Sequence, residues 1–199
     1  MDPLSPYRDR LLNIVDRPAV LKRLDQPVRL ASGALSKAFI DGKRAVAHPD
    51  DLDYVGRAMV AAARGAGATF DAVGGLVLGA VPFTFAVANH ARCQWFMIRK
   101  EPKGRGTNQW AEGAVIEPGM RVMIVDDIIT TGGSIRDAYT RVVEQGAQVV
   151  FATTLVDRGE RAKPFFAAEG VPYQPLLTYR DLGIDSLDDE LRAAAVAAT

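Results

Sequence analysis

Two adjacent carboxylates followed by a glycine-rich turn are the part of this sequence best suited to chemistry. The apolar residues 122–125 lead directly into Asp126 and Asp127, and a Thr-Thr-Gly-Gly-Ser turn follows at residues 130–134. Such a turn at the start of a helix directs free backbone N–H groups and hydroxyl donors toward one anion. Its glycines let the backbone approach that anion closely. The stretch therefore predicts a phosphate site.

The carboxylates restrict what that ligand can be. A bare phosphate would be repelled by Asp126 and Asp127, so the ligand should carry phosphate at one end and hydroxyls or a bound cation at the other. A sugar phosphate with free ribose hydroxyls meets both requirements. Mg²⁺ also fits, because it shares few carboxylates with substrate phosphates and keeps several waters. The alternative, solvated acids beside a polar helix cap, would explain a lone Asp-Asp pair better than the whole stretch.

The elements that must position these residues alternate between strands and helices. We expect strands at 73–78, 95–98, 122–125, 149–156 and 173–178, and intervening helices at 82–91, 134–145 and 162–169. This order predicts an α/β fold with a mostly parallel sheet, in which ligands bind beyond the carboxyl ends of the strands. Further helices are expected after Pro6, from Pro49 to about Gly65, and at 186–198, with short strand-like pieces at 28–41 and a polar segment at 99–113.

Composition excludes several classes of protein. The 199 residues are 48% hydrophobic, which is too apolar for a disordered chain. The single cysteine, Cys93, excludes an intrachain disulfide and favours a reducing, cytoplasmic location. Zero formal net charge argues against a dedicated polyanion binder, so no nucleic-acid partner is expected. No signal peptide is recognisable, and the uncharged stretch 72–91, with several glycines and Pro82, favours a buried strand, turn and helix over a membrane span.

Residues 125–134 resemble the loop that binds phosphoribosyl pyrophosphate (PRPP) in type I phosphoribosyltransferases. Residues 99–107 resemble the mobile basic loop of orotate phosphoribosyltransferases specifically, and so do Ser32-Gly33 and the segment 39–41. Residues 156–158 match the Val-Asp-Arg segment of that family. The resemblance extends from about Leu30 to Asp185 and so covers most of the chain.

The resemblance implies a fold, a reaction and partners. The fold is a mostly parallel central sheet flanked by helices, with residues 1–48 forming an N-terminal helix and hood and residues 49–199 forming the core with its basic loop, 99–113. The reaction transfers the 5-phosphoribosyl group from PRPP to orotate, giving orotidine 5′-phosphate and pyrophosphate with Mg²⁺ as cofactor. A homodimer is implied, with the basic loop of one subunit acting at the site of the other.

The same resemblance implies roles for individual residues. Catalytic roles fall to Lys103, Arg105, Asp126 and Asp127, and both aspartates would contact Mg²⁺ indirectly, through water or substrate. Orotate would be contacted by Thr130 and Arg158. PRPP would be bound by Arg99, Lys100, Lys103, Arg105, Asp126, Asp127, Ile128, Ile129, Thr130, Thr131, Gly132, Gly133 and Ser134.

The basic segment carries four cations within seven residues, Arg99 to Arg105. Pro102, Gly104 and Gly106 keep it non-helical. Clustered cations on a flexible loop suit a pyrophosphate group that gains charge as it leaves, and closure of the loop would exclude water. The alternatives are a solvated loop or a nucleic-acid patch.

The sequence departs from the family pattern at three places: one, on the basic loop, keeps the positive charge but cannot transfer a proton near neutral pH, and the other two, both missing lysines, affect the choice of base. Arg105 stands where the family usually has His, Ala31 replaces a common Lys before Ser-Gly, and residues 75–82, around Leu78, contain no lysine. Recognition of the orotate carboxylate then depends more on Arg158, with Asp41 and Lys43 as further candidates on the base side. Two alternatives stay open: a phosphoribosyltransferase for a purine or another base, and a non-catalytic PRPP-sensing regulator.

Overall fold

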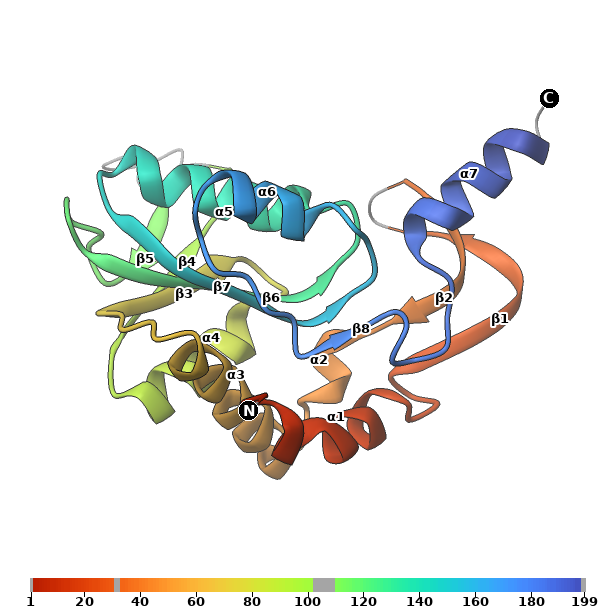
Figure 1. The fold of residues 1–199 in the computed structure, drawn as a ribbon, viewed down its shortest axis with the longest axis horizontal. Coiled ribbons are helices and arrows are strands. Elements are labelled where there is room, and N and C mark those ends of the chain that lie inside the picture. Colours follow the sequence, from red (N-terminus) through yellow and green to blue (C-terminus); the bar gives the residue numbers. More distant parts are fainter. Residues whose placement is uncertain (1, 31–32, 102–109, 198–199) are drawn as a thin grey trace.

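A six-stranded sheet forms the centre of the molecule (Figure 1). The computed structural model describes residues 2–30, 33–101 and 110–197, the last five of these by backbone alone. Neighbouring strands pair in the order β5-β4-β3-β6-β7-β8, and all pairs are parallel except β4 with β5. The strands are β3 (Ala72–Leu76), β4 (Gln94–Ile98), β5 (Ala111–Gly113), β6 (Arg121–Ile129), β7 (Gln148–Asp157) and β8 (Leu177–Thr178).

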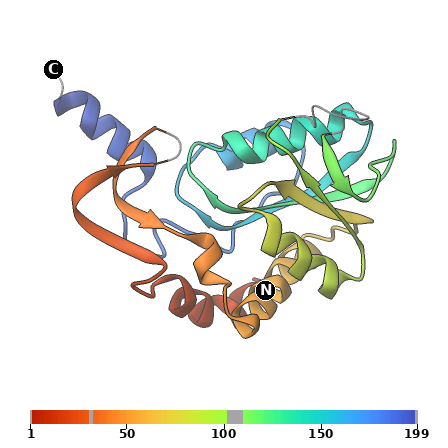
Figure 2. The same ribbon diagram turned by 180° about the vertical axis from the view of Figure 1, so that it is seen from behind.

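Helices cover both faces of this sheet (Figures 1 and 2). One face packs against α3 (Pro49–Gly65) and α4 (Val81–Ala91), and the other against α5 (Gly133–Glu144) and α6 (Ala162–Ala168). Residues of β6 alternate between the two cores, because successive side chains of a strand point to opposite faces. Met123 and Val125 join the α3–α4 side, whereas Val122 and Ile124 join the α5–α6 side. A strand buried on both faces explains the continuous apolar run.

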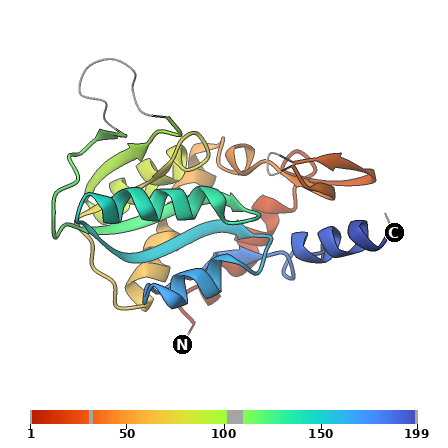
Figure 3. The same ribbon diagram turned by 90° about the horizontal axis from the view of Figure 1, so that it is seen from above.

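The N-terminal hood is a separate two-stranded antiparallel sheet of β1 (Leu21–Arg29) and β2 (Leu35–Ile40). The helix α1 (Arg8–Val15) precedes it, after a 3₁₀ turn at Ser5–Tyr7, and α2 (Gly42–Ala45) follows it. The C-terminal helix α7 (Leu187–Ala197) lies against β2, away from the main sheet (Figure 3). The expected fold, a mostly parallel sheet flanked by helices with an N-terminal hood, is confirmed. The division at residue 48 stays a prediction, and α7 completes the hood from the other end of the chain.

Local signals account for the helix boundaries. Pro49 occupies the first turn of α3, and the His48 ring accepts a hydrogen bond from Asp50 N. Ser186 caps α7, accepting from Asp189 N at 3.0 Å. None of the described helices has the length and apolar character needed to cross a membrane.

Several strand boundaries differ from those expected. β6 continues through Ile129, because Asp126, Ile128 and Ile129 pair with β7 in register. At the other edge Gln174 N and Leu176 N still donate to Ala152 O and Thr154 O of β7, but only Leu177–Thr178 of the expected strand 173–178 forms a strand. β1 begins seven residues earlier than expected, and β5 is a short strand inside the segment that was expected to be a polar loop.

Candidate active site

A cleft of about 600 Å³ opens at the carboxyl ends of the central strands. The chain moves outward from β3 to β4 on one side and from β6 to β7 on the other, so the order of strands reverses between β3 and β6. Ligands of open α/β sheets bind at such a reversal. The hood contributes the opposite wall through Leu30, Phe39, Ile40, Asp41 and Lys43.

The floor of the cleft is the turn between β6 and α5. Gly132 has φ +79° and ψ 7°, the left-handed conformation that glycine adopts without strain, and α5 begins at the next residue. The first turn of α5 carries no acidic residue. The positive end of a twelve-residue helix therefore meets the cleft together with the hydroxyls of Thr130, Thr131 and Ser134. This arrangement can hold a phosphate.

The two aspartates occupy different environments. Asp126 is only 5% exposed, and its Oδ1 accepts a hydrogen bond from Asp127 N at 2.9 Å. Burial, reinforced by the charge of Asp127, raises the pKa of Asp126 well above its ordinary value, and the nearby charge of Lys100 opposes this. Asp127 lies beside Gly79, where an added Cβ would come within 2.4 Å of Oδ1. Glycine at 79 thus leaves room for the Asp127 carboxylate.

The hood contacts the acidic pair through one lysine. Lys43 Nζ lies 3.8 Å from Asp127 Oδ2 and 3.5 Å from Asp41 Oδ1. Asp41 is itself fixed by its position at the start of α2, where its carboxylate accepts from Arg44 N. Lys43 therefore connects the wall expected to hold the base with the carboxylates expected to hold the sugar.

Arg158 follows β7 and borders the cleft, yet most of its donors are bound by neighbouring residues of the protein. Its side chain is 1% exposed, and its backbone N–H donates to Ile129 O. The guanidinium donates to Ala38 O (2.8 Å), to Ser36 Oγ (2.9 Å) and to Glu190 Oε2 (3.3 Å). Burial lowers the pKa of Arg158, and the charge of Glu190 opposes that shift. Its Nε is buried without a partner among the residues that the structure describes.

The described residues on either side of 102–109 contact each other and the core. Arg99 N donates to Trp110 O, and Arg99 Nε lies 3.1 Å from Glu112 Oε1. The guanidinium of Arg141, on α5, lies 3.2 Å from the centre of the Trp110 ring. Lys103 and Arg105, the expected catalytic cations, lie outside the described residues, as do Ala31 and Ser32.

Most of the residues predicted from the sequence meet at this one cleft. Arg99 is the exception among the described ones, since it is not part of the lining and pairs with Glu112 instead. Ile128 and Ile129 border the cleft while their side chains pack against the two cores. The predicted residues that line the cleft are Lys100, Asp126, Asp127, Ile128, Ile129, Thr130, Thr131, Gly132, Gly133, Ser134 and Arg158.

Ser36 and Glu190 were missed from the sequence. A serine in a short strand and a glutamate in a terminal helix carry no motif, and their positions are 154 residues apart. The terminal helix itself was predicted, at 186–198, but its packing against β2 was not.

Comparisons with known proteins agree on one family. Residues 44–166 match the model of the phosphoribosyl transferase domain. An orotate phosphoribosyltransferase of Rhodopirellula baltica is 38% identical over 165 residues, covering 78% of this chain and 85% of the relative. One from Methanothermobacter thermautotrophicus is 42% identical over 152 residues, covering 76% and 82%.

Solved structures extend this similarity to three dimensions. Mycobacterium tuberculosis orotate phosphoribosyltransferase in complex with PRPP is 33% identical, with a TM-score of 0.70, over 89% of this chain and 99% of the other. An adenine phosphoribosyltransferase of Thermoanaerobacter pseudethanolicus is 18% identical, with a TM-score of 0.57, over 71% and 88%. The second likeness concerns the fold alone.

Proposed function

This chain belongs to the phosphoribosyltransferase family and, within it, to the orotate phosphoribosyltransferases, and we propose that its cleft transfers the 5-phosphoribosyl group from PRPP to orotate. The observation that carries this proposal is the continuity of the floor of the cleft. Within one stretch of β6 and α5 lie two carboxylates, a hydroxyl-rich turn and a helix N-terminus. That sequence of groups matches the ribose hydroxyls and the 5′-phosphate of one ligand.

The proposed roles follow from where each group lies. Thr130 to Ser134 hold the 5′-phosphate, and Asp126 and Asp127 hold the ribose hydroxyls. As the bond from C1′ to the pyrophosphate oxygen breaks and the bond from C1′ to the base nitrogen forms, positive charge develops on the ribosyl ring. Two carboxylates beneath that ring stabilise this charge, so positioning and electrostatics carry the rate. Thr130 and Arg158 stay our candidates for contacting orotate.

The acidic pair also fits Mg²⁺. No cluster of three metal-ligating side chains occurs among the described residues, which argues against a cage made by the protein alone. Two neighbouring carboxylates, one of them with its pKa raised by burial and by its neighbour, form a site that a shared cation would stabilise. We propose that Asp126 and Asp127 hold the ion through water or substrate oxygens. The ion supplies neutralising charge for the pyrophosphate.

The remaining proposals concern the basic segment, assembly and location. Lys100 lines the cleft, and Lys103 and Arg105 are proposed to contact pyrophosphate from the same segment.

A homodimer in which this segment acts at the partner's site is proposed from the family resemblance. A cytoplasmic location is proposed from the single, unpairable cysteine.

One assay tests the function. The protein is incubated with Mg²⁺, PRPP and each of several bases, and pyrophosphate release is measured. We expect release with orotate alone. Release with adenine or guanine but not with orotate would overturn the base assignment. No release with any base would favour a PRPP-sensing protein without turnover.

A further inference from the structure

Three segments that are distant in sequence meet at the guanidinium of Arg158. The strand β2 supplies Ser36 and Ala38, the end of β7 supplies the arginine, and α7 supplies Glu190. The Glu190 side chain is 13% exposed and the arginine 1%. The ion pair is therefore almost entirely removed from water.

Glu190 makes more contacts than a counterion needs. Its Oε1 lies 2.9 Å from Ser36 Oγ and accepts from Lys37 N at 3.1 Å, while Oε2 takes the guanidinium. One carboxylate thus fixes both the arginine and the strand that leads into Phe39, which lines the base-side wall of the cleft. A buried cation without such a partner would be strongly unfavourable.

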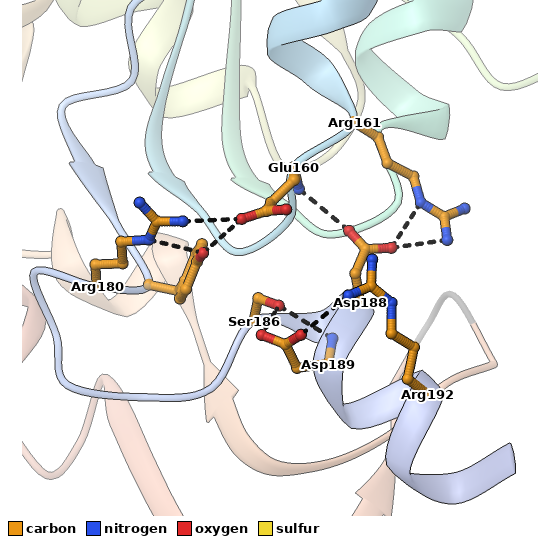
Figure 4. Close-up of polar contacts among 8 residues, drawn as sticks. Glu160, Arg161, Arg180, Ser186, Asp188, Asp189 and Arg192 are labelled. Carbon is orange, nitrogen blue, oxygen red and sulfur yellow. Dashed lines mark hydrogen bonds and ion pairs between the residues drawn. The ribbon is translucent and has the colours of Figure 1, made fainter. Parts of the chain in front are cut away.

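Attachment of α7 to the core does not depend on Glu190 alone. Figure 4 shows that Asp188 pairs with Arg161 (2.7 Å) and accepts from the backbone N–H of Glu160 (3.2 Å). The start of the helix is closed by Ser186 and Asp189. Asp188 thus attaches the helix to the core, and Glu190 contacts β2 and Arg158 beside the base-side wall.

We propose that Glu190 is a positioning residue: it holds Arg158 and β2 in the arrangement that accepts the base. This inference rests on the proposed function, because it assigns the base side of the cleft to orotate. Arg158 borders the cleft and has a buried Nε without a partner among the described residues. Glu190 fixes the rotation of the guanidinium and so determines where its remaining donors point. Glu190 itself need not touch the substrate.

The test is Glu190→Gln, which keeps the size and one acceptor oxygen but removes the charge. We expect the KM for orotate to rise about tenfold, as when one charge-assisted hydrogen bond is weakened. The KM for PRPP should stay within about twofold, because the phosphate-binding turn is untouched. Ser36 on β2 accepts a hydrogen bond from the same guanidinium, so Ser36→Ala should also raise the KM for orotate. Circular dichroism establishes that each variant is folded.

Asp188→Asn is the matched control, since it removes one negative charge from the same helix and loosens its docking without contacting Arg158. Its KM for orotate should stay close to wild type. An equal rise in both helix variants would mean that helix docking in general, not Glu190, sets the base-side wall, and would overturn the inference. An unchanged or lower KM for orotate in Glu190→Gln would overturn it too. Absence of orotate turnover in the wild-type protein would instead contradict the proposed function.

Discussion

The ammonium group of Lys43 lies 3.8 Å from the carboxylate of Asp127, so a cation of the hood faces the acidic pair of the core. The segment between β3 and α4 contains no lysine, and Leu78 within it is 74% exposed. Lys43 is thus the hood's direct electrostatic contact with the floor of the cleft.

We predict that Lys43→Met lowers kcat/KM for PRPP about five- to tenfold, because it removes the positive charge that pairs with Asp127 in the cleft. The free energy of unfolding should change by less than about 1 kcal/mol, since the Lys43 side chain is 55% exposed and such ion pairs contribute little. Steady-state kinetics and urea denaturation measure the two effects. Arg44→Met, on the same short helix but outside the cleft lining, should leave kcat/KM unchanged. Equal losses in both variants would contradict this role for Lys43.

Asp126→Asn should make the protein more stable and less active. The pKa of Asp126 is raised in the folded protein above its ordinary value of 3.8, so folding favours the protonated form. In the wild type, the protonated Asp126 side chain therefore adds to the free energy of unfolding at low pH, and this contribution is lost as pH rises through the folded pKa. The free energy of unfolding of the asparagine variant should therefore exceed that of the wild type by an amount that grows with pH and levels off above the folded pKa of Asp126. Urea denaturation between pH 4 and 8 measures it.

The same variant should lose about 100-fold or more in kcat, because a charge that stabilises the transition state has gone. Asparagine keeps an Oδ1 to accept from Asp127 N, so the backbone contact survives. A variant that is no more stable than wild type at pH 8 would show that burial of this carboxylate carries no cost.

Gly79→Ala should damage activity much more than stability. The added methyl would come within 2.4 Å of Asp127 Oδ1, and a carboxylate at the end of a side chain can move aside at little cost to the fold. A displaced Asp127 should lower kcat/KM by between about tenfold and 100-fold. Thermal unfolding and steady-state kinetics on the same preparation separate the two effects. Wild-type kinetics with a lowered melting temperature would be the contrary result.

Lys103→Ala should lower kcat about 100-fold with a much smaller effect on PRPP affinity, if its charge meets the pyrophosphate chiefly as that group leaves. Rapid-quench kinetics and equilibrium binding of PRPP measure the two quantities. Lys163→Ala, an exposed lysine on α6, is the control for loss of one positive charge. An unchanged kcat would remove Lys103 from the chemistry.

The core of the fold was predictable because its signals are local. β6 is buried on both faces and reads as an apolar run, and α3 and α7 begin at recognisable caps. The acidic pair and its turn lie within nine residues, so the floor of the cleft could be predicted as one unit. In this unit the end of β6 was misplaced, because pairing with β7 extends the strand through two carboxylates that look like a strand end.

The hood was harder to predict because the sequence of its first strand shows no clear alternation of apolar and polar residues. β1 has one fully buried residue, Leu21, and most of its other positions are exposed, so it lacks the alternation that marks a half-buried strand. The pairing of Glu190 with Ser36 and Arg158 is set by how distant elements pack, and no spacing along the chain encodes it. The residues on the floor of the cleft, and Arg158, Asp41 and Lys43 on its other side, could therefore be named from the sequence, whereas the contacts of Ser36 and Glu190 with Arg158 could not.

The attachment of α7 to β2 has a consequence for synthesis on the ribosome. Chains emerge and fold from the N-terminus, so the strands of the sheet and the turn after β6 are synthesised before translation reaches residue 190. The hood strands are made first, yet the carboxylate that neutralises Arg158 beside them is made more than 150 residues later. Chains that terminate before residue 190 would therefore contain the acidic pair and the glycine-rich turn but lack the carboxylate that pairs with buried Arg158.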